Sequence, residues 1–201
     1  VDTIEPIVEM RSLISERVGG GGSFFTLNPD VEDIIEKYMI KRNNIYFLKM
    51  GAVKQGGTSC YCKENTVLNS IISSLLLKKD ELVVLDMGAG IEHLTRGTSK
   101  CVDLMIIVTE PNPVSIQTAK TIEKLCNELG IDLIRFIGNK VRSQKEVDFL
   151  YTELSKERIL EIIPFSEEII NNALESNFLN YNPKELDNVA SAILAGQKKK
   201  N

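Results

Sequence analysis

The sequence is poor in cysteine and histidine and has no excess of positive charge. Four cysteines in 201 residues are too few for a disulfide framework, so we expect reduced thiols and a cytoplasmic location. Lys and Arg number 24 against 28 Asp and Glu, giving a net charge of −4. A chain with this balance has no field to attract a polyphosphate backbone, which disfavours general nucleic-acid binding.

Long apolar runs are also missing. No stretch approaches the about 20 residues that a membrane-spanning helix needs, and the first residues lack the basic and apolar regions of a signal peptide. Hydrophobic residues make up 43% of the chain, a fraction typical of globular proteins. We therefore expect no membrane span and a single domain over residues 1–201.

From residue 45 onward, short apolar runs alternate with helical patterns. Runs with little polar interruption suit parallel strands covered on both faces. The predicted strands are Ile45–Met50, Leu82–Met87, Leu104–Thr109, Leu133–Ile137 and Arg158–Ile163. The predicted helices are Pro6–Arg17, Thr66–Leu77, Ser115–Leu129, Lys145–Leu154, Ser166–Leu174 and Pro183–Leu194, and Phe24–Leu27 is strand-like. This alternation predicts an α/β fold with a doubly wound, mostly parallel sheet flanked by helices.

Four consecutive glycines, Gly19 to Gly22, invite comparison with a phosphate loop. The comparison fails because Ser23 and two phenylalanines follow, with no G-x-x-x-x-G-K-[ST] pattern. A surface turn is the better interpretation.

Asp86 and Gly90 form the first candidate nucleotide site. The predicted strand would deliver Asp86 to the carboxyl edge of the sheet, where open α/β sheets place their ligands. In a nucleotide hydrolase such an Asp reaches Mg²⁺ through water, and the backbone N–H of Gly90 could sense a γ-phosphate. Asp86 could equally be a helix cap after a strand.

Asn139 and Lys140 follow another predicted strand in the same way. An Asn amide can both donate to and accept from the edge of a nucleobase. A loop-capping role for Asn139 is the alternative.

Cys60 and Cys62 form a candidate metal site in a glycine-rich, loop-like context. Two thiolates spaced in this way can face one soft ion but leave it half coordinated. Other side chains, or the same pair from a second copy, would have to complete the site. A thiol pair without a ligand remains the alternative. The single histidine, His93, and the apolar-flanked Cys101 and Cys126 are more simply structural.

Taken together, these segments resemble one family. The resemblance rests on the run from Asp86 to Thr98, Cys60-x-Cys62, Glu110-Pro111, Asn139-Lys140 and Ile163-Pro164-Phe165. Together they resemble the carbon monoxide dehydrogenase maturation ATPases, which are P-loop ATPases of the MinD and nitrogenase iron protein type.

The resemblance implies an ATPase that inserts nickel into carbon monoxide dehydrogenase, its client. It implies a homodimer formed around ATP and Mg²⁺, with Ni²⁺ or Zn²⁺ held between subunits by Cys60 and Cys62. In the resemblance, Asp86 matches the acidic residue of the switch II segment. Asn139, in the motif Asn139-Lys140, matches the asparagine that contacts adenine. Pro164 and Phe165 match the loop beside the base. Glu110-Pro111 is expected near the nucleotide without supplying chemistry.

The sequence departs from this family at one motif. Members open with a strand, a phosphate loop K-G-G-x-G-K-[ST] and a helix, and the 201 residues do not contain that motif. We therefore expect a domain that lacks this first unit and no ATP hydrolysis by these residues alone. Two other functions stay open: a metallochaperone or scaffold that uses no nucleotide, and an iron–sulfur electron carrier.

Overall fold

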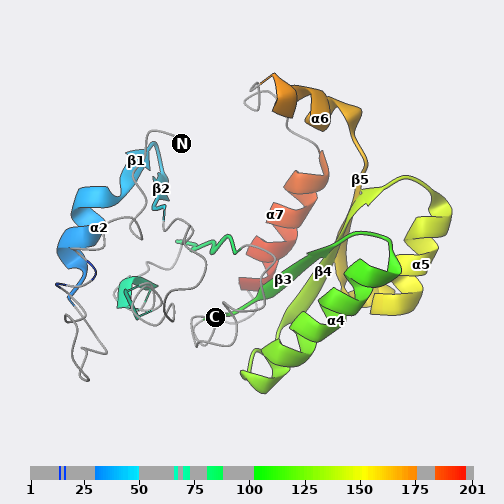
Figure 1. Ribbon diagram of the computed structural model, residues 1–201, viewed down its shortest axis with the longest axis horizontal. Coiled ribbons are helices and arrows are strands. Elements are labelled where there is room, and N and C mark those ends of the chain that lie inside the picture. The colour runs from blue at the N-terminus through cyan, green and yellow to red at the C-terminus, as the bar shows by residue number, and fades with distance from the viewer. Residues whose placement is uncertain are drawn as a thin grey trace, which may run out of the picture. The chain divides into compact units, whose positions relative to one another are not determined.

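The computed structural model describes residues 14, 16, 30–49, 66–67, 70–72, 81–87, 102–175 and 184–197. They fall in two compact units, one within Val1–Cys101 and the other within Val102–Asn201. Figure 1 labels their helices and strands, and each unit is described in turn.

Among the described residues of the first unit are helix α2 and a two-stranded hairpin. Helix α2, Glu32–Tyr38, carries acidic residues in its first turn and a lysine in its last, which suits the helix dipole. Strands β1, Ile40–Arg42, and β2, Ile45–Phe47, pair antiparallel across a two-residue turn. Asn43 adopts a φ of 56° in that turn, a conformation that Asn tolerates better than most residues.

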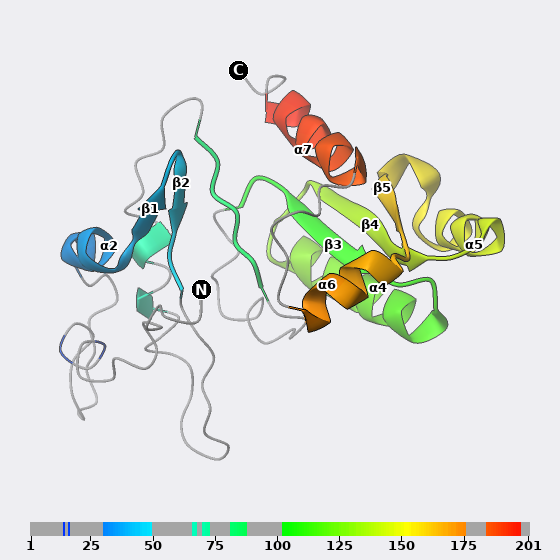
Figure 2. The same ribbon diagram turned by 90° about the horizontal axis from the view of Figure 1, so that it is seen from above.

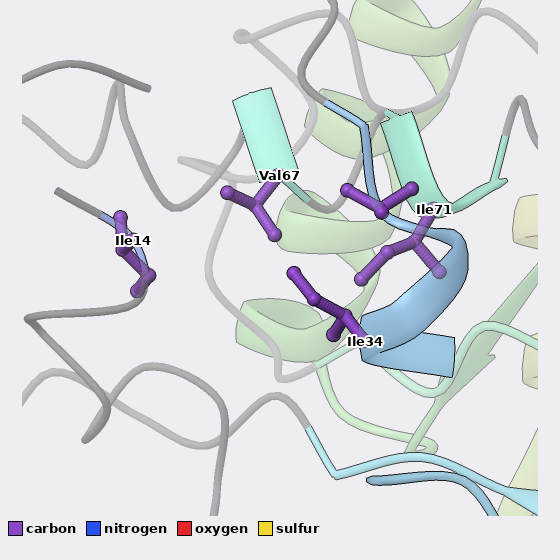
Figure 3. Close-up of a cluster of buried hydrophobic side chains, with 5 residues drawn as sticks. Ile14, Ile34, Val67 and Ile71 are labelled. Atoms are coloured by element: carbon purple, nitrogen blue, oxygen red, sulfur yellow. The ribbon is translucent and has the colours of Figure 1, made fainter. Parts of the chain in front are cut away.

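A small apolar core supports α2. Ile14, Val31, Ile34, Val67 and Ile71 are each at most 4% exposed, and Figure 3 shows this cluster with Ile14, Ile34, Val67 and Ile71 labelled. Val67 and Ile71 lie in helical segments, as the predicted helix Thr66–Leu77 requires. Burial of these two residues is therefore confirmed, while most of that predicted helix lies outside the described residues.

Of the two predicted strands of this region, Ile45–Met50 is confirmed in part as β2, Ile45–Phe47, while its buried, parallel setting and the strand Leu82–Met87 are wrong. All three residues of β2 are exposed and its partner is antiparallel, because the Asn43-Asn44 turn folds the chain back on β1. Residues 81–87 form neither helix nor strand, and Val84 is 78% exposed. An apolar run becomes a strand only where its backbone groups find a partner, and a sequence pattern does not supply one.

The second unit is a three-stranded parallel sheet in the order β3-β4-β5. Its strands are β3 Met105–Thr109, β4 Ile134–Val141 and β5 Ile159–Pro164. Its helices are α4 Pro113–Glu128, α5 Gln144–Leu154, η4 Lys156–Arg158, α6 Glu167–Leu174 and α7 Lys184–Gln197. The three predicted strands and four predicted helices of this unit are confirmed, with shifts at their ends.

Helices cover both faces of this sheet, as Figure 2 shows. Helices α4 and α5 share one face, where Lys120 of α4 bonds Glu153 of α5 at 2.7 Å. Helix α7 lies on the other face, where the Asn188 amide donates to Glu161 of β5 at 2.8 Å. The alternation of strand and helix with helices on both faces confirms the α/β, doubly wound, mostly parallel class.

Local signals explain where these helices begin and end. Asn112, Ser143 and Ser166 cap α4, α5 and α6 by accepting a backbone N–H three residues later. Gly130 ends α4 in a Schellman motif, in which Ile131 N–H donates to Cys126 O and Gly130 N–H to Asn127 O. The φ of +78° at Gly130 explains why a glycine stands there.

Gly138 is required for packing rather than for its backbone angles. A Cβ at this position would lie 2.5 Å from Leu150 Cδ1 and 2.7 Å from Ile162 Cδ1, and Leu150 is fully buried. We expect Gly138→Ala to lower the free energy of unfolding by about 1 to 3 kcal/mol through overpacking. Urea unfolding measures the change.

Gly130→Asn is the control for that substitution, because no atom lies within 4 Å of its Cβ position and Asn tolerates the left-handed region. It should cost less than about 1 kcal/mol. Equal losses at Gly138 and Gly130 would contradict the packing argument.

Candidate functional site

Three strand ends bring polar and aromatic residues to one edge of the parallel sheet. Thr109 of β3 pairs with Gly138 of β4, and Glu110 comes directly after Thr109. Val141 of β4 pairs with Pro164 of β5, and Phe165 follows. Because all three strands run the same way, their carboxyl ends lie together, which is where open α/β sheets bind ligands.

Asn139 and Lys140 lie in an irregularity of the central strand. The ladder between β4 and β5 is interrupted between Gly138 and Val141. Lys140 has a φ of 58°, and its backbone N–H donates to Asn139 Oδ1 at 3.0 Å. A left-handed lysine costs roughly 1 to 2 kcal/mol, so surrounding contacts must hold it. Asn139 and Lys140 therefore have no partner on β5 in the register of the two strands.

Glu110 and Lys140 join the ends of β3 and β4. Lys140 Nζ lies 2.6 Å from Glu110 Oε1, with side chains that are 58% and 43% exposed. The backbone oxygen of Glu110 also accepts the N–H of Asn112 at 2.8 Å, which ties it to the first turn of α4. The lysine charge at this edge is thus neutralised by a carboxylate from the neighbouring strand.

Phe165 gives the edge its aromatic surface. Its N–H donates to Val141 O at 2.9 Å, and the guanidinium carbon of Arg142 lies 3.8 Å from its ring centroid. The N–H of Arg142 donates to Glu146 Oε2 at 2.6 Å, so the arginine backbone is anchored at the start of α5. Arg142 therefore covers part of the Phe165 ring through a cation–π contact.

A shallow hollow of about 390 Å³ adjoins Arg142 and Pro164. It is lined by Val141, Arg142, Ser143, Gln144, Val147, Ile162, Pro164 and Glu185. The end of β5, the beginning of α5 and Glu185 of α7 therefore border the same hollow.

The chemistry of this edge suits a flat heterocycle with polar edges. The Asn139 amide nitrogen makes no hydrogen bond within the described part of the chain, so it can donate outward. Its oxygen retains a second lone pair. Pro164 and Phe165 supply apolar surface at the end of the neighbouring strand, where both contact Val141. One donor and one acceptor on an amide match the N7 and N6 edge of adenine.

The structure brings together four of the predicted site residues: Asn139, Lys140, Pro164 and Phe165. Asp86 is exposed in the first unit. Gly90, Cys60 and Cys62 lie outside the described residues. Within the described ranges, no group of three or more His, Cys, Asp or Glu side chains could hold a metal ion, so the metal site stays a prediction.

Sequence reasoning missed two participants. Glu110 was expected to lie near the nucleotide without supplying chemistry, and that expectation stays a prediction; what was not anticipated is the bond between its carboxylate and Lys140. Arg142 was not singled out at all. Each comes directly after the last residue of a strand, and that position is the signal that could have identified them.

None of the helices in the described ranges is long and apolar enough to cross a membrane.

Comparison with known proteins gives the family. No protein-family model matches the chain. An ATP-binding protein of Methanocaldococcus jannaschii is 42% identical over 197 residues, covering 94% of this chain and 74% of that protein. A second ATP-binding protein of the same organism is 29% identical, covering 92% of this chain and 73% of that protein.

The carbon monoxide dehydrogenase accessory protein CooC of Rhodospirillum rubrum is 41% identical over 167 residues. That match covers 82% of this chain and 64% of CooC, so the chain spans less than two thirds of that relative. The identities and coverage, together with the parallel α/β sheet, place the chain: it belongs to the CooC-type family of ATP-binding proteins.

Proposed function

We propose that this protein is a cytoplasmic, ATP-dependent maturation factor that binds nickel and assists its insertion into carbon monoxide dehydrogenase. In this proposal it acts as a homodimer, with ATP and Mg²⁺ as cofactors and Ni²⁺, or Zn²⁺ in its place, as cargo. The observation that carries the proposal is the 41% identity to CooC over 82% of the chain.

The base-binding part of the proposal rests on the edge formed by β4 and β5. Asn139 would donate through Nδ2 to N7 of adenine and accept from the exocyclic amine through Oδ1. Pro164 and Phe165 would border the base. The free amide donor of Asn139 and the ring of Phe165 support this assignment, since both lie where the carboxyl ends of the strands meet.

The phosphate-binding part involves Asp86 and Gly90. Asp86 would orient water around Mg²⁺, and the backbone N–H of Gly90 would contact the γ-phosphate. The exposure of Asp86 is compatible with that role. Hydrolysis also needs a lysine-bearing phosphate loop, which the 201 residues do not contain. The proposal therefore assigns nucleotide and Mg²⁺ binding to Asp86 and Gly90, and it does not assign ATP hydrolysis to these two residues by themselves.

The metal-binding part rests on Cys60 and Cys62. Thiolates are the ligands that a soft divalent ion prefers, and they persist as thiols in a reducing compartment. Two chains would supply four sulfurs to one ion on a two-fold axis. This arrangement makes nickel a cargo that can be released when the dimer opens.

The deciding experiment is nickel transfer to nickel-free carbon monoxide dehydrogenase. Full-length protein loaded with Ni²⁺ should activate the enzyme faster than free Ni²⁺ at equal concentration, and ATP should be required. Activation that is equally fast without the protein would overturn the proposal. Activation without any nucleotide would instead favour a metallochaperone that uses none.

Asn139→Ala tests the base-binding part separately. We expect the affinity for ADP to fall about tenfold, because one bidentate amide contact to a base is worth roughly 1 to 3 kcal/mol. Isothermal titration calorimetry on full-length protein measures the change.

The matched control is Asn127→Ala, which removes an exposed amide from the last turn of α4, away from the carboxyl ends of the strands. Its affinity for ADP should equal that of the wild type. Equal ADP affinity of the Asn139 variant and the wild type would exclude this amide from the base site.

A further inference from the structure

We propose that Glu110 is a positioning residue for base recognition: its ion pair with Lys140 holds the Asn139 amide in the orientation that selects adenine over guanine. The inference rests on the proposed function, because it concerns the same base site. It assigns a role to a residue for which the sequence predicted none.

The first step concerns the backbone of Lys140. A φ of 58° is unfavourable for lysine, so the conformation persists only where contacts hold it. Two contacts do so: the Lys140 N–H donates to Asn139 Oδ1 at 3.0 Å, and Lys140 Nζ lies 2.6 Å from Glu110 Oε1. The second contact reaches across to β3 and fixes the lysine at its far end.

The second step concerns the direction of the Asn139 amide. The Lys140 N–H is a donor, so the atom of Asn139 that faces it must be the oxygen. The amide nitrogen is thereby left as a donor, with no partner among the described residues. If Lys140 were released, the local turn could relax and the amide could rotate.

The third step concerns the base. A fixed amide with one donor and one spare acceptor matches adenine, which offers N7 as acceptor and the N6 amine as donor. Guanine offers two acceptors, N7 and O6, on the same edge, and O6 would face the Asn139 oxygen. An amide free to rotate loses part of this discrimination.

The ion pair itself adds little to stability. Both side chains are about half exposed, and exposed pairs are worth at most about 1 kcal/mol. Its removal should therefore change base preference without unfolding the protein. The pair between Lys120 and Glu153, at 2.7 Å with side chains 43% and 34% exposed, offers a matched control between α4 and α5.

The experiment compares Glu110→Gln and Lys140→Gly with Glu153→Gln in full-length protein. Affinities for ADP and GDP are measured by calorimetry, and the side-chain amide signal of Asn139 is followed by NMR without nucleotide. We expect the ADP preference to fall roughly two- to fivefold in Glu110→Gln and to stay unchanged in Glu153→Gln. Lys140→Gly should keep most of the preference, since glycine tolerates a positive φ and holds the turn without the pair.

A double variant supplies the rescue. Glu110→Lys combined with Lys140→Glu restores an ion pair with the charges exchanged, and most of the ADP preference should return. A purely structural role would lower both affinities or the melting temperature together, and would leave their ratio unchanged.

The outcomes separate the two proposals. An unchanged ADP to GDP ratio and an unchanged Asn139 amide signal in Glu110→Gln would overturn the positioning role. Failure of the wild type to bind either nucleotide would overturn the proposed function, and the amide signal would still decide whether Glu110 orients Asn139.

Discussion

Replacing Cys60 and Cys62 together by serine should abolish binding of Ni²⁺ and Zn²⁺ by this protein. The metal ligand is the thiolate, whereas a serine hydroxyl stays protonated at neutral pH and is a hard, weak ligand. When both cysteines of each chain are replaced, the site shared by two chains keeps no sulfur ligand. Metal titration of reduced protein, with bound metal determined by mass spectrometry, measures the effect.

The wild type should bind one ion per two chains, since each chain offers two closely spaced thiolates and such an ion commonly takes four sulfurs. Light scattering should show a dimer in the metal-bound state. A fully occupied site on a monomer would contradict the shared arrangement.

Cys126 supplies the matched control for the cysteine substitutions. Its side chain is fully buried in α4, and burial, with the nearby Glu123 carboxylate as a smaller cause, raises the pKa of its thiol. A neutral, buried thiol is a poor metal ligand, so Cys126→Ala should keep full metal binding. Metal retained by the Cys60 and Cys62 double variant but lost in Cys126→Ala would overturn the assignment.

The second unit was predictable because its signals are local and consistent. Its strands are apolar runs such as Met105–Thr109, and its helices begin at capping residues such as Asn112 and Ser143. Pattern and capping chemistry agree at each boundary, which is what a sequence needs to specify its elements. The right-handed crossovers then leave few topologies to consider.

The hairpin and the segment 81–87 were not predictable in the same way. Both have β-branched, apolar residues, and that pattern does not distinguish a buried parallel strand from an exposed hairpin or from a segment outside any described strand. The Asn43-Asn44 pair was the overlooked turn signal. Helix α2 was also missed, although acidic Glu32 and Asp33 mark its first turn.

Part of the candidate site follows from strand ends alone. Asn139, Lys140, Pro164 and Phe165 each come at the end of an apolar run, and parallel strands bring those ends together. The link between Glu110 and Lys140 depends on a left-handed residue in an interrupted ladder. A pattern of apolar and polar residues does not encode that angle, so this contact required the structure.

Removing the ring of Phe136 should cause the largest loss of stability in the second unit. Phe136 is fully buried on the central strand, paired with Ile107 on one side and Ile159 on the other. We expect Phe136→Ala to lower the free energy of unfolding by about 3 to 5 kcal/mol, because the lost burial adds to the cost of a cavity. Native domains are stable by only about 5 to 15 kcal/mol, so this is a large fraction.

Urea unfolding followed by circular dichroism measures that loss, and two further variants make the result decisive. Leu174→Ala removes a side chain that is 80% exposed at the end of α6 and should change stability by less than about 0.5 kcal/mol. Phe136→Leu keeps most of the volume and should lose less than half as much as Phe136→Ala, so it reports on the site even where the alanine variant does not fold. Losses at Phe136 no larger than at Leu174 would show that the β3-β4-β5 sheet does not depend on this ring, and that its stability comes instead from the helices on its two faces.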